Sequence, residues 1–155
     1  MKKIKIYLET SAISNLYQLN KPKEMADMKA LWELLKQGEY DVVISQTVIK
    51  ELNDTKDDTK REMLFDYLDQ IDLDTAEISE EMLKIAQLVI LQGILTENSY
   101  NDCEHVAYAL ITNCDCIVSY NFRHLVKIRT ITGVQRLANI HGYGNINIVS
   151  ADYLL

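Results

Sequence analysis

Near its start, the chain has a short stretch that alternates with the period of a β-strand and ends on a carboxylate. Isoleucine and leucine alternate with lysine and tyrosine over residues 3–8, which predicts a strand with Glu9 at its carboxyl end and Thr10 and Ser11 directly behind. In open α/β sheets, ligands bind beside the carboxyl ends of the strands. Glu9 is therefore a candidate functional residue, with a solvated charge that closes an ordinary strand as the alternative.

The remainder of the chain alternates helical stripes with short apolar runs. Helices are expected over 28–35 with a stop at Gly38, from residue 48, over 60–70, over 79–92 before Gly93, and over 102–111. Strands are expected over 41–45, 116–120 and 145–149, with a brief extended segment over 71–73 and a loop over 53–58. This alternation predicts an α/β fold, and 155 residues fit one domain.

Composition indicates the class of protein and the compartment in which we expect it. The chain has 48 % hydrophobic and 25 % charged residues, which is ordinary for a soluble globular protein. No apolar run approaches the ~20 residues of a membrane span, and no apolar signal-peptide core follows the first residues. The three cysteines are an odd set, in agreement with a reducing compartment, and without a C-x-x-C pair they make a zinc site with His105 improbable. We therefore expect a cytoplasmic protein with no membrane association.

Charge is unevenly distributed along the chain. A net charge of −7 argues against a general nucleic-acid binder that relies on a basic surface. Residues 116–151, however, contain no acid and carry four positive charges, among them Arg123 and Lys127. This asymmetry indicates an anionic partner on one side of the domain, with a merely solvated basic face as the alternative.

Three more polar residues follow predicted strands or open predicted helices. Glu51 comes shortly after strand 41–45, Asp102 opens the helix over 102–111, and Asn121 follows strand 116–120. Each acid alone is also explained by the favourable charge at a helix start. Crowded carboxylates repel, so a cluster with Glu9 is expected chiefly around a hard divalent cation, Mg²⁺ or Mn²⁺. Such an ion binds a phosphate oxygen and lowers the pKa of a bound water, which suits phosphodiester cleavage.

The neighbours of these acids are predicted to support them. Asp102 and His105 lie three residues apart along one edge of an apolar helix face, where both would look into a crevice. The alternative makes Asp102 a helix-cap acid and His105 a satisfied edge residue. Thr10 and Ser11 are expected to support the metal or its water because they follow Glu9.

Together these segments resemble a known family. Residues 6–11, Glu51, 101–107 and 119–125 occur in an order and spacing similar to the PIN-domain family, in particular its small VapC-type toxin branch. The resemblance extends through the final strand. It implies one PIN-like domain over 1–155, a three-layer α/β/α sandwich with a mostly parallel sheet, and Mg²⁺- or Mn²⁺-dependent ribonuclease activity. Many family members are toxins that a small antitoxin protein neutralises.

Carried over residue by residue, the resemblance makes Glu9, Glu51, Asp102 and Asn121 the metal-binding and catalytic residues. The family has Asp more often at the first position, so the arm of Glu9 moves its carboxylate by about one methylene. Asn121 is neutral, which leaves three negative charges in the site and makes a second tightly held ion less expected.

Substrate and partners follow from the same resemblance and from the charge distribution. Arg123 and Lys127 are predicted to contact RNA phosphates, although Arg123 has the alternative role of pairing with one of the acids. An antitoxin or a second copy of the chain is expected as partner, with Tyr17 and Tyr67 as exposed aromatic side chains. The alternative to a ribonuclease is a PIN-fold module that binds nucleic acid or protein and hydrolyses little.

Overall fold

A computed structural model describes residues 2–155 and contains one five-stranded sheet whose neighbouring strands are all parallel. The strand order is β3-β2-β1-β4-β5. The strands are β1 (Lys5–Leu8), β2 (Asp41–Ser45), β3 (Asp74–Ala76), β4 (Cys116–Val118) and β5 (Asn147–Val149). The helices are α1 (Thr10–Ser14), α2 (Pro22–Lys36), α3 (Gln46–Asn53), α4 (Asp58–Leu68), α5 (Glu80–Leu91), α6 (Tyr100–Ile111) and α7 (Ile128–Ile140).

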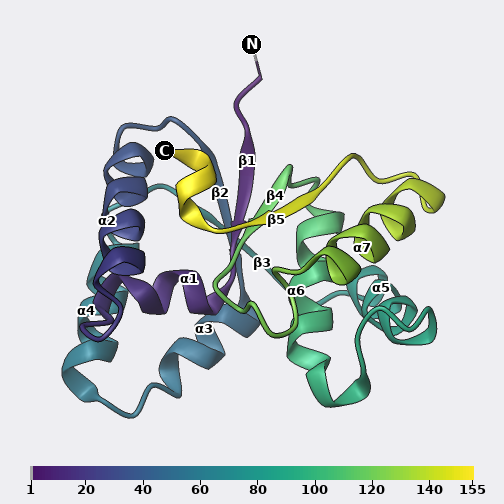
Figure 1. The fold of residues 1–155 in the computed structure, drawn as a ribbon, viewed down its shortest axis with the longest axis horizontal. Helices are drawn as coiled ribbons and strands as arrows, with labels where there is room; N and C mark the ends of the chain where they lie inside the picture. The colour runs from purple at the N-terminus through teal and green to yellow at the C-terminus, as the bar shows by residue number, and fades with distance from the viewer. Residues whose placement is uncertain (1) are drawn as a thin grey trace.

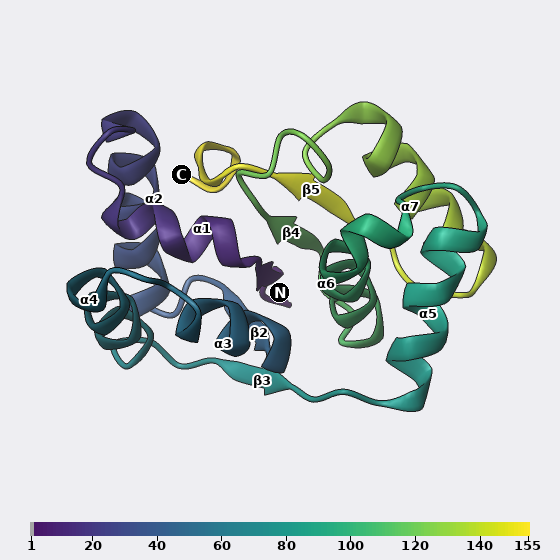
Figure 2. The same cartoon turned by 90° about the horizontal axis from the view of Figure 1, so that it is seen from below.

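Helices cover both faces of the sheet. Helices α2 and α4 lie on one side, and α5, α6 and α7 lie on the other, so the molecule has three layers (Figures 1 and 2). The predicted α/β/α sandwich is confirmed, and its sheet is wholly parallel. Within residues 2–155, no helix combines the length and apolarity needed to cross a bilayer.

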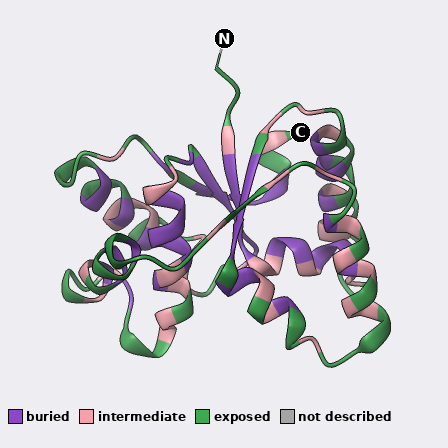
Figure 3. Cartoon of the chain, turned by 180° about the vertical axis from the view of Figure 1, so that it is seen from behind, coloured by how far each residue is buried: buried purple, intermediate pink, exposed green. Residues whose placement is uncertain are grey.

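Strand β1 lies at the centre of the sheet and is buried on both faces. Its register pairs Ile6 with Val42 of β2 and with Cys116 of β4. Ile6, Tyr7 and Leu8 are all fully buried, and Figure 3 shows the strands as the buried centre of the molecule. Tyr7, which alternates with the aliphatic residues in the sequence, is buried as well, because helices cover both faces of the sheet.

Helix α2 forms as its sequence predicts. Pro22 occupies the first turn, where its missing N–H costs no hydrogen bond, and Gly38 follows the helix with φ of +76°. Trp32 is buried within the apolar stripe and donates its indole N–H to the Tyr67 carbonyl at 3.0 Å. Tyr67 packs edge-on against Trp32, and both Tyr17 and Tyr67 lie half-buried against the core. Their predicted exposure was wrong.

Two other expectations differ from the structure. The extended segment near residues 71–73 lies slightly later, as β3, because Asp74 is the residue in register with Val43. This edge strand is largely exposed and carries no apolar pattern to locate it. Helix α7 lies within the acid-free basic stretch and was not expected, although Val134, Leu137 and Ala138 belong to its buried stripe.

Candidate active site at the carboxyl edge of the sheet

The carboxyl ends of β2, β1 and β4 meet at one edge of the sheet (Figure 2). The chain passes from β1 to β2 on one side and places β4 on the other side of β1, so the strand order reverses beside β1. A crevice opens at such a switch point, because the two connections leave in opposite directions. Glu9 follows β1 and Ser119 follows β4, which places both residues at this point.

Glu9 is held across the switch point by hydroxyl and backbone donors. Its Oε1 accepts hydrogen bonds from Ser11 Oγ and Ser119 Oγ, each at 2.5 Å, and its Oε2 accepts from the Ser11 N–H at 2.9 Å. Ser11 Oγ in turn accepts from the Tyr120 N–H, and Ser119 Oγ from the Asn121 N–H. The Glu9 carboxylate is only 5 % exposed, and these three donors compensate for the water that it has lost.

Glu51 projects from α3, which begins directly after β2. Its Oε1 accepts hydrogen bonds from Thr10 Oγ1 at 2.8 Å and from His105 Nε2 at 2.6 Å. Burial by itself would raise the pKa of the Glu51 carboxyl, but the hydrogen bonds from His105 and Thr10 lower it below its usual range. Glu51 is therefore ionised at neutral pH and is joined to the segment that follows Glu9.

Asp102 lies in the first turn of α6 and faces Asn121. Asn121 Nδ2 donates to both Asp102 oxygens, at 3.3 and 3.4 Å, while Asn121 Oδ1 accepts from the His124 N–H at 3.0 Å. Burial raises the pKa of Asp102, and the negative charges of Glu9 and Glu51 raise it further. Asp102 is therefore close enough to Glu9 and Glu51 to be repelled by both.

The two basic residues lie on the surface beyond the acids. Arg123 and Lys127 are exposed, and Lys127 immediately precedes α7. Across residues 2–155, no ion pair joins either of them to an acid, which speaks against the alternative role of Arg123 as a partner of Glu51 or Asp102. Glu51, Asp102 and His124 line one open pocket of about 380 Å³ beside the start of α6.

A comparison with protein families matches the PIN domain over residues 6–129. The chain belongs to the PIN-domain family. The structure is also similar to the crystal structure of VapBC2 from Rickettsia felis bound to a DNA fragment from their promoter, with a TM-score of 0.59. That similarity covers 94 % of this chain and 98 % of the other at 16 % sequence identity, so it supports the fold alone. No curated protein sequence matches the chain.

The possible metal-ligating atoms at this end of the PIN domain are of the kind that binds a hard cation. Three carboxylates, an amide and nearby hydroxyls supply oxygen ligands, the kind that Mg²⁺ and Mn²⁺ prefer. Within residues 2–155, no three acidic, histidine or cysteine side chains are grouped tightly enough to surround an ion. Each carboxylate instead accepts hydrogen bonds from its own donors. The negative charges of Glu9 and Glu51 add to the effect of burial in raising the pKa of Asp102.

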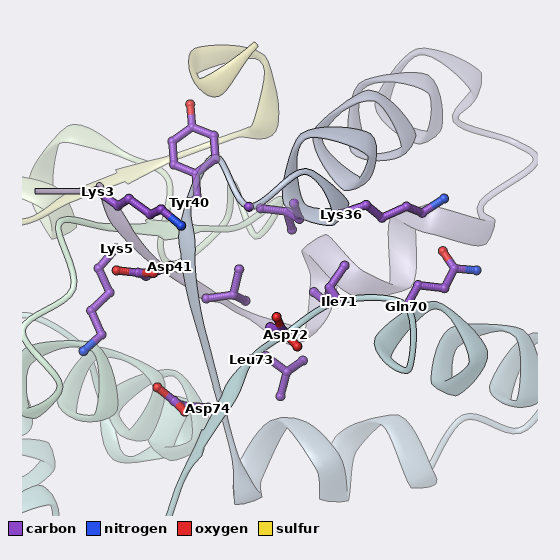
Figure 4. Close-up of a pocket in the computed structure, with 13 residues that line it drawn as sticks. Lys3, Lys5, Lys36, Tyr40, Asp41, Gln70, Ile71, Asp72, Leu73 and Asp74 are labelled. Carbon is purple, nitrogen blue, oxygen red and sulfur yellow. The ribbon is translucent and has the colours of Figure 1, made fainter. Parts of the chain in front are cut away.

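A larger hollow lies at the opposite edge of the PIN domain, beside the start of β1 and β2 (Figure 4). It has a volume of about 640 Å³ and is lined by the lysines Lys3, Lys5 and Lys36 and the aspartates Asp41, Asp72 and Asp74. Its charges balance, and it lies away from the carboxyl ends of the strands. We therefore place the candidate site of the PIN domain at the acidic edge.

The sequence prediction for His105 needs correction, and three residues of the site were missed. His105 is fully buried beneath Glu51 and does not face a crevice. Ser119, Tyr7 and Ser45 were not predicted, although each bonds a predicted residue or its partner. Ser119 stands at a strand end like Glu9, and that position was a usable signal. Tyr7 and Ser45 had none, because both appeared to be ordinary strand residues.

Proposed function

We propose that this PIN domain is a divalent-metal-dependent endoribonuclease that hydrolyses RNA phosphodiester bonds. PIN domains are generally nucleases. The observation that carries the proposal is that Glu9, Glu51 and Asp102, from three separate segments, lie at the same end of the sheet, where burial and the charges of Glu9 and Glu51 raise the pKa of Asp102. Such repelling acids suit a cation-assisted reaction on an anionic substrate.

In this proposal, Glu9, Glu51 and Asp102 hold Mg²⁺ or Mn²⁺. The bound cation would supply Lewis-acid polarisation of a phosphate oxygen and would lower the pKa of a water. Asn121 is the fourth proposed ligand, either directly or through a water, and its Nδ2 also donates a hydrogen bond to Asp102. Ser11 and Ser119 orient the Glu9 carboxylate, and Thr10 does the same for Glu51.

Arg123 and Lys127 are the proposed RNA contacts. Both side chains are exposed, and both follow Asn121 within a stretch that contains no acid. Cations at this position let an acidic protein bind a phosphate backbone near its own carboxylates.

The test is a cleavage assay on a defined single-stranded RNA and on DNA of the same sequence. We expect cleavage of RNA with Mn²⁺ or Mg²⁺, none with EDTA, and none by Asp102→Asn. Asp72→Asn is the matched control, because it makes the same change at an exposed position on the opposite edge of the sheet. Cleavage of DNA alone would contradict the RNA assignment.

A binding module with little hydrolysis is the second candidate. The specific observation in its favour is that each carboxylate already has its own hydrogen-bond donors. RNA binding without cleavage at any tested concentration of Mn²⁺ would support this candidate and refute the nuclease.

We further propose a cytoplasmic toxin that pairs with a small antitoxin protein or with a second copy of itself. The support is the resemblance to VapC-type toxins and the similar fold found in VapBC2. Purification from the native host should yield a complex or a dimer by light scattering. A monodisperse monomer with no copurifying chain would contradict this part of the proposal.

A further inference from the structure

A buried chain of hydrogen bonds runs from the core to Glu51. Ser45 Oγ and Tyr7 Oη lie 2.8 Å apart, Tyr7 Oη and His105 Nδ1 lie 2.6 Å apart, and His105 Nε2 lies 2.6 Å from Glu51 Oε1. Ser45, Tyr7 and His105 are each fully buried. Four segments contribute to this chain, namely β1, the end of β2, α6 and, with Glu51, α3.

The carboxylate fixes the direction of the bond at one end of this chain. An ionised carboxylate can only accept, so His105 Nε2 carries a hydrogen and donates it to Glu51 whether or not the ring is charged. In a neutral ring, His105 Nδ1 then accepts a hydrogen bond from the Tyr7 hydroxyl; in a charged ring, it donates one to that oxygen. Both ring nitrogens are thus engaged, and a half-turn of the imidazole would break both bonds.

Packing in the core fixes the position of the Tyr7 hydroxyl. The Tyr7 ring stacks on Tyr108 with an interplanar angle of 10° and a centroid distance of 6.4 Å. Ser45 holds the hydroxyl from the other side and also caps α3, because its Oγ accepts from the Val48 N–H at 3.2 Å. A phenylalanine at position 7 would keep the ring packing, so the buried hydroxyl is not needed to fill the core.

We propose that Tyr7 and Ser45 are positioning residues that hold the His105 ring and, through it, the Glu51 carboxylate. The role of Glu51 as a cation ligand rests on the proposed function, whereas the order imposed on His105 does not. Groups that hydrogen-bond to metal ligands fix ligand orientation, and their loss typically weakens metal binding by about 10- to 100-fold. The Tyr7 hydroxyl is linked to Glu51 only through His105. Removing that hydroxyl therefore tests whether the orientation of His105 determines the orientation of Glu51.

The experiment compares Tyr7→Phe with Tyr108→Phe in the full chain. Both variants lose one hydroxyl from the same buried ring stack, but the Tyr108 hydroxyl bonds Thr47 and not His105. We expect Tyr7→Phe to weaken Mn²⁺ binding by about tenfold or more in calorimetric titrations, and Tyr108→Phe by less than about twofold. A role limited to stability would lower the Tm of both variants alike and leave Mn²⁺ affinity unchanged.

A second readout needs no metal. In ¹⁵N-labelled protein, the His105 Nε2–H should give a resonance protected from exchange with water, which Tyr7→Phe should broaden or remove and Tyr108→Phe should retain. Unchanged Mn²⁺ affinity in Tyr7→Phe, or a retained resonance, would overturn the inference. Absence of Mn²⁺ binding by the unmodified protein would instead refute the proposed function, and the resonance alone would then decide whether Tyr7 orders His105.

Discussion

Replacing Asp102 with asparagine should stabilise this protein in EDTA at neutral pH. Burial raises the pKa of Asp102 first, and the charges of Glu9 and Glu51 raise it further, so the folded state holds the ionised carboxylate at a cost. Interactions between partly exposed charges are typically worth up to about 1 kcal/mol, so we expect a gain of roughly 0.5–1 kcal/mol. For a chain of this length, the Tm should rise by about 1–4 °C. The amide oxygen introduced by Asp102→Asn would still accept a hydrogen bond from Asn121.

The sign of the pH dependence is also fixed. A carboxyl group whose pKa is raised in the folded state destabilises the fold once it ionises. The gain in stability from Asp102→Asn is therefore complete at pH values above the folded-state pKa. It fades as the pH falls and disappears below the unfolded value of about 3.9, where Asp102 is protonated in both states. Thermal unfolding in EDTA from pH 3 to pH 8 measures this profile, with Asp72→Asn as the control that should follow the unmodified protein.

Adding Mn²⁺ should make the unmodified protein more stable than Asp102→Asn. A ligand at 100 times its Kd stabilises the folded state by about 2.7 kcal/mol, so saturating Mn²⁺ should raise the Tm of the unmodified protein by about 5–10 °C. Asp102→Asn should lose most of that rise. A variant that is less stable than the unmodified protein in EDTA would refute the repulsion argument, and a variant that keeps the full Mn²⁺ effect would remove Asp102 from the ligand set.

Three further predictions concern the surface and the core. Lys127→Glu should weaken RNA binding and lower the salt dependence of that binding (the slope of log K against log salt concentration) by about one to two units, measured by fluorescence anisotropy. Lys29→Glu, at an exposed position of α2, should change neither quantity. Trp32→Phe should lower the free energy of unfolding by roughly 2 kcal/mol in urea, because it loses ring volume and the bond to the Tyr67 carbonyl, while RNA cleavage at 25 °C stays unchanged. Burial raises the pKa of the three thiols, so at pH 8 they should react with a disulfide reagent only after unfolding; the values are about 11 for Cys103 and Cys114 and about 12 for Cys116.

Much of the fold could be predicted because its central strands have clear apolar patterns with polar residues at their ends. Strands β2 and β4 are continuous apolar runs, β1 alternates, and the predicted ligands follow from the ends of these strands or the helices behind them. Strand β3 was misplaced because an exposed edge strand has no apolar face to mark it. Helix α7 was missed because Gly133 and several β-branched residues lower the helix propensity that its buried stripe would otherwise indicate.

The predicted acids and Asn121 lie at one edge of the sheet, but beyond Thr10 and Ser11 the sequence could not predict which residues hold the acids. Ser119 bonds a residue 110 positions away, and Tyr7 bonds a residue 98 positions away. Such pairs depend on strand order and on how α6 packs against the sheet. A local pattern contains neither, so the burial of His105 and its bonds emerged only from the three-dimensional structure.

Glu9 and Asn121, the two departures from the family pattern, are explained by the same hydrogen bonds. The longer arm of Glu9 is held by Ser11 and Ser119, whose hydroxyls both reach Oε1, so the extra methylene adds little freedom to the carboxylate. A fourth acid in place of Asn121 would add one more repelling charge beside Asp102, whereas the Asn121 amide donates to it. Glu9 and Asn121 therefore reduce the repulsion that Asp102 experiences, and they leave three carboxylates, each oriented by its own hydrogen bonds, as the proposed cation ligands.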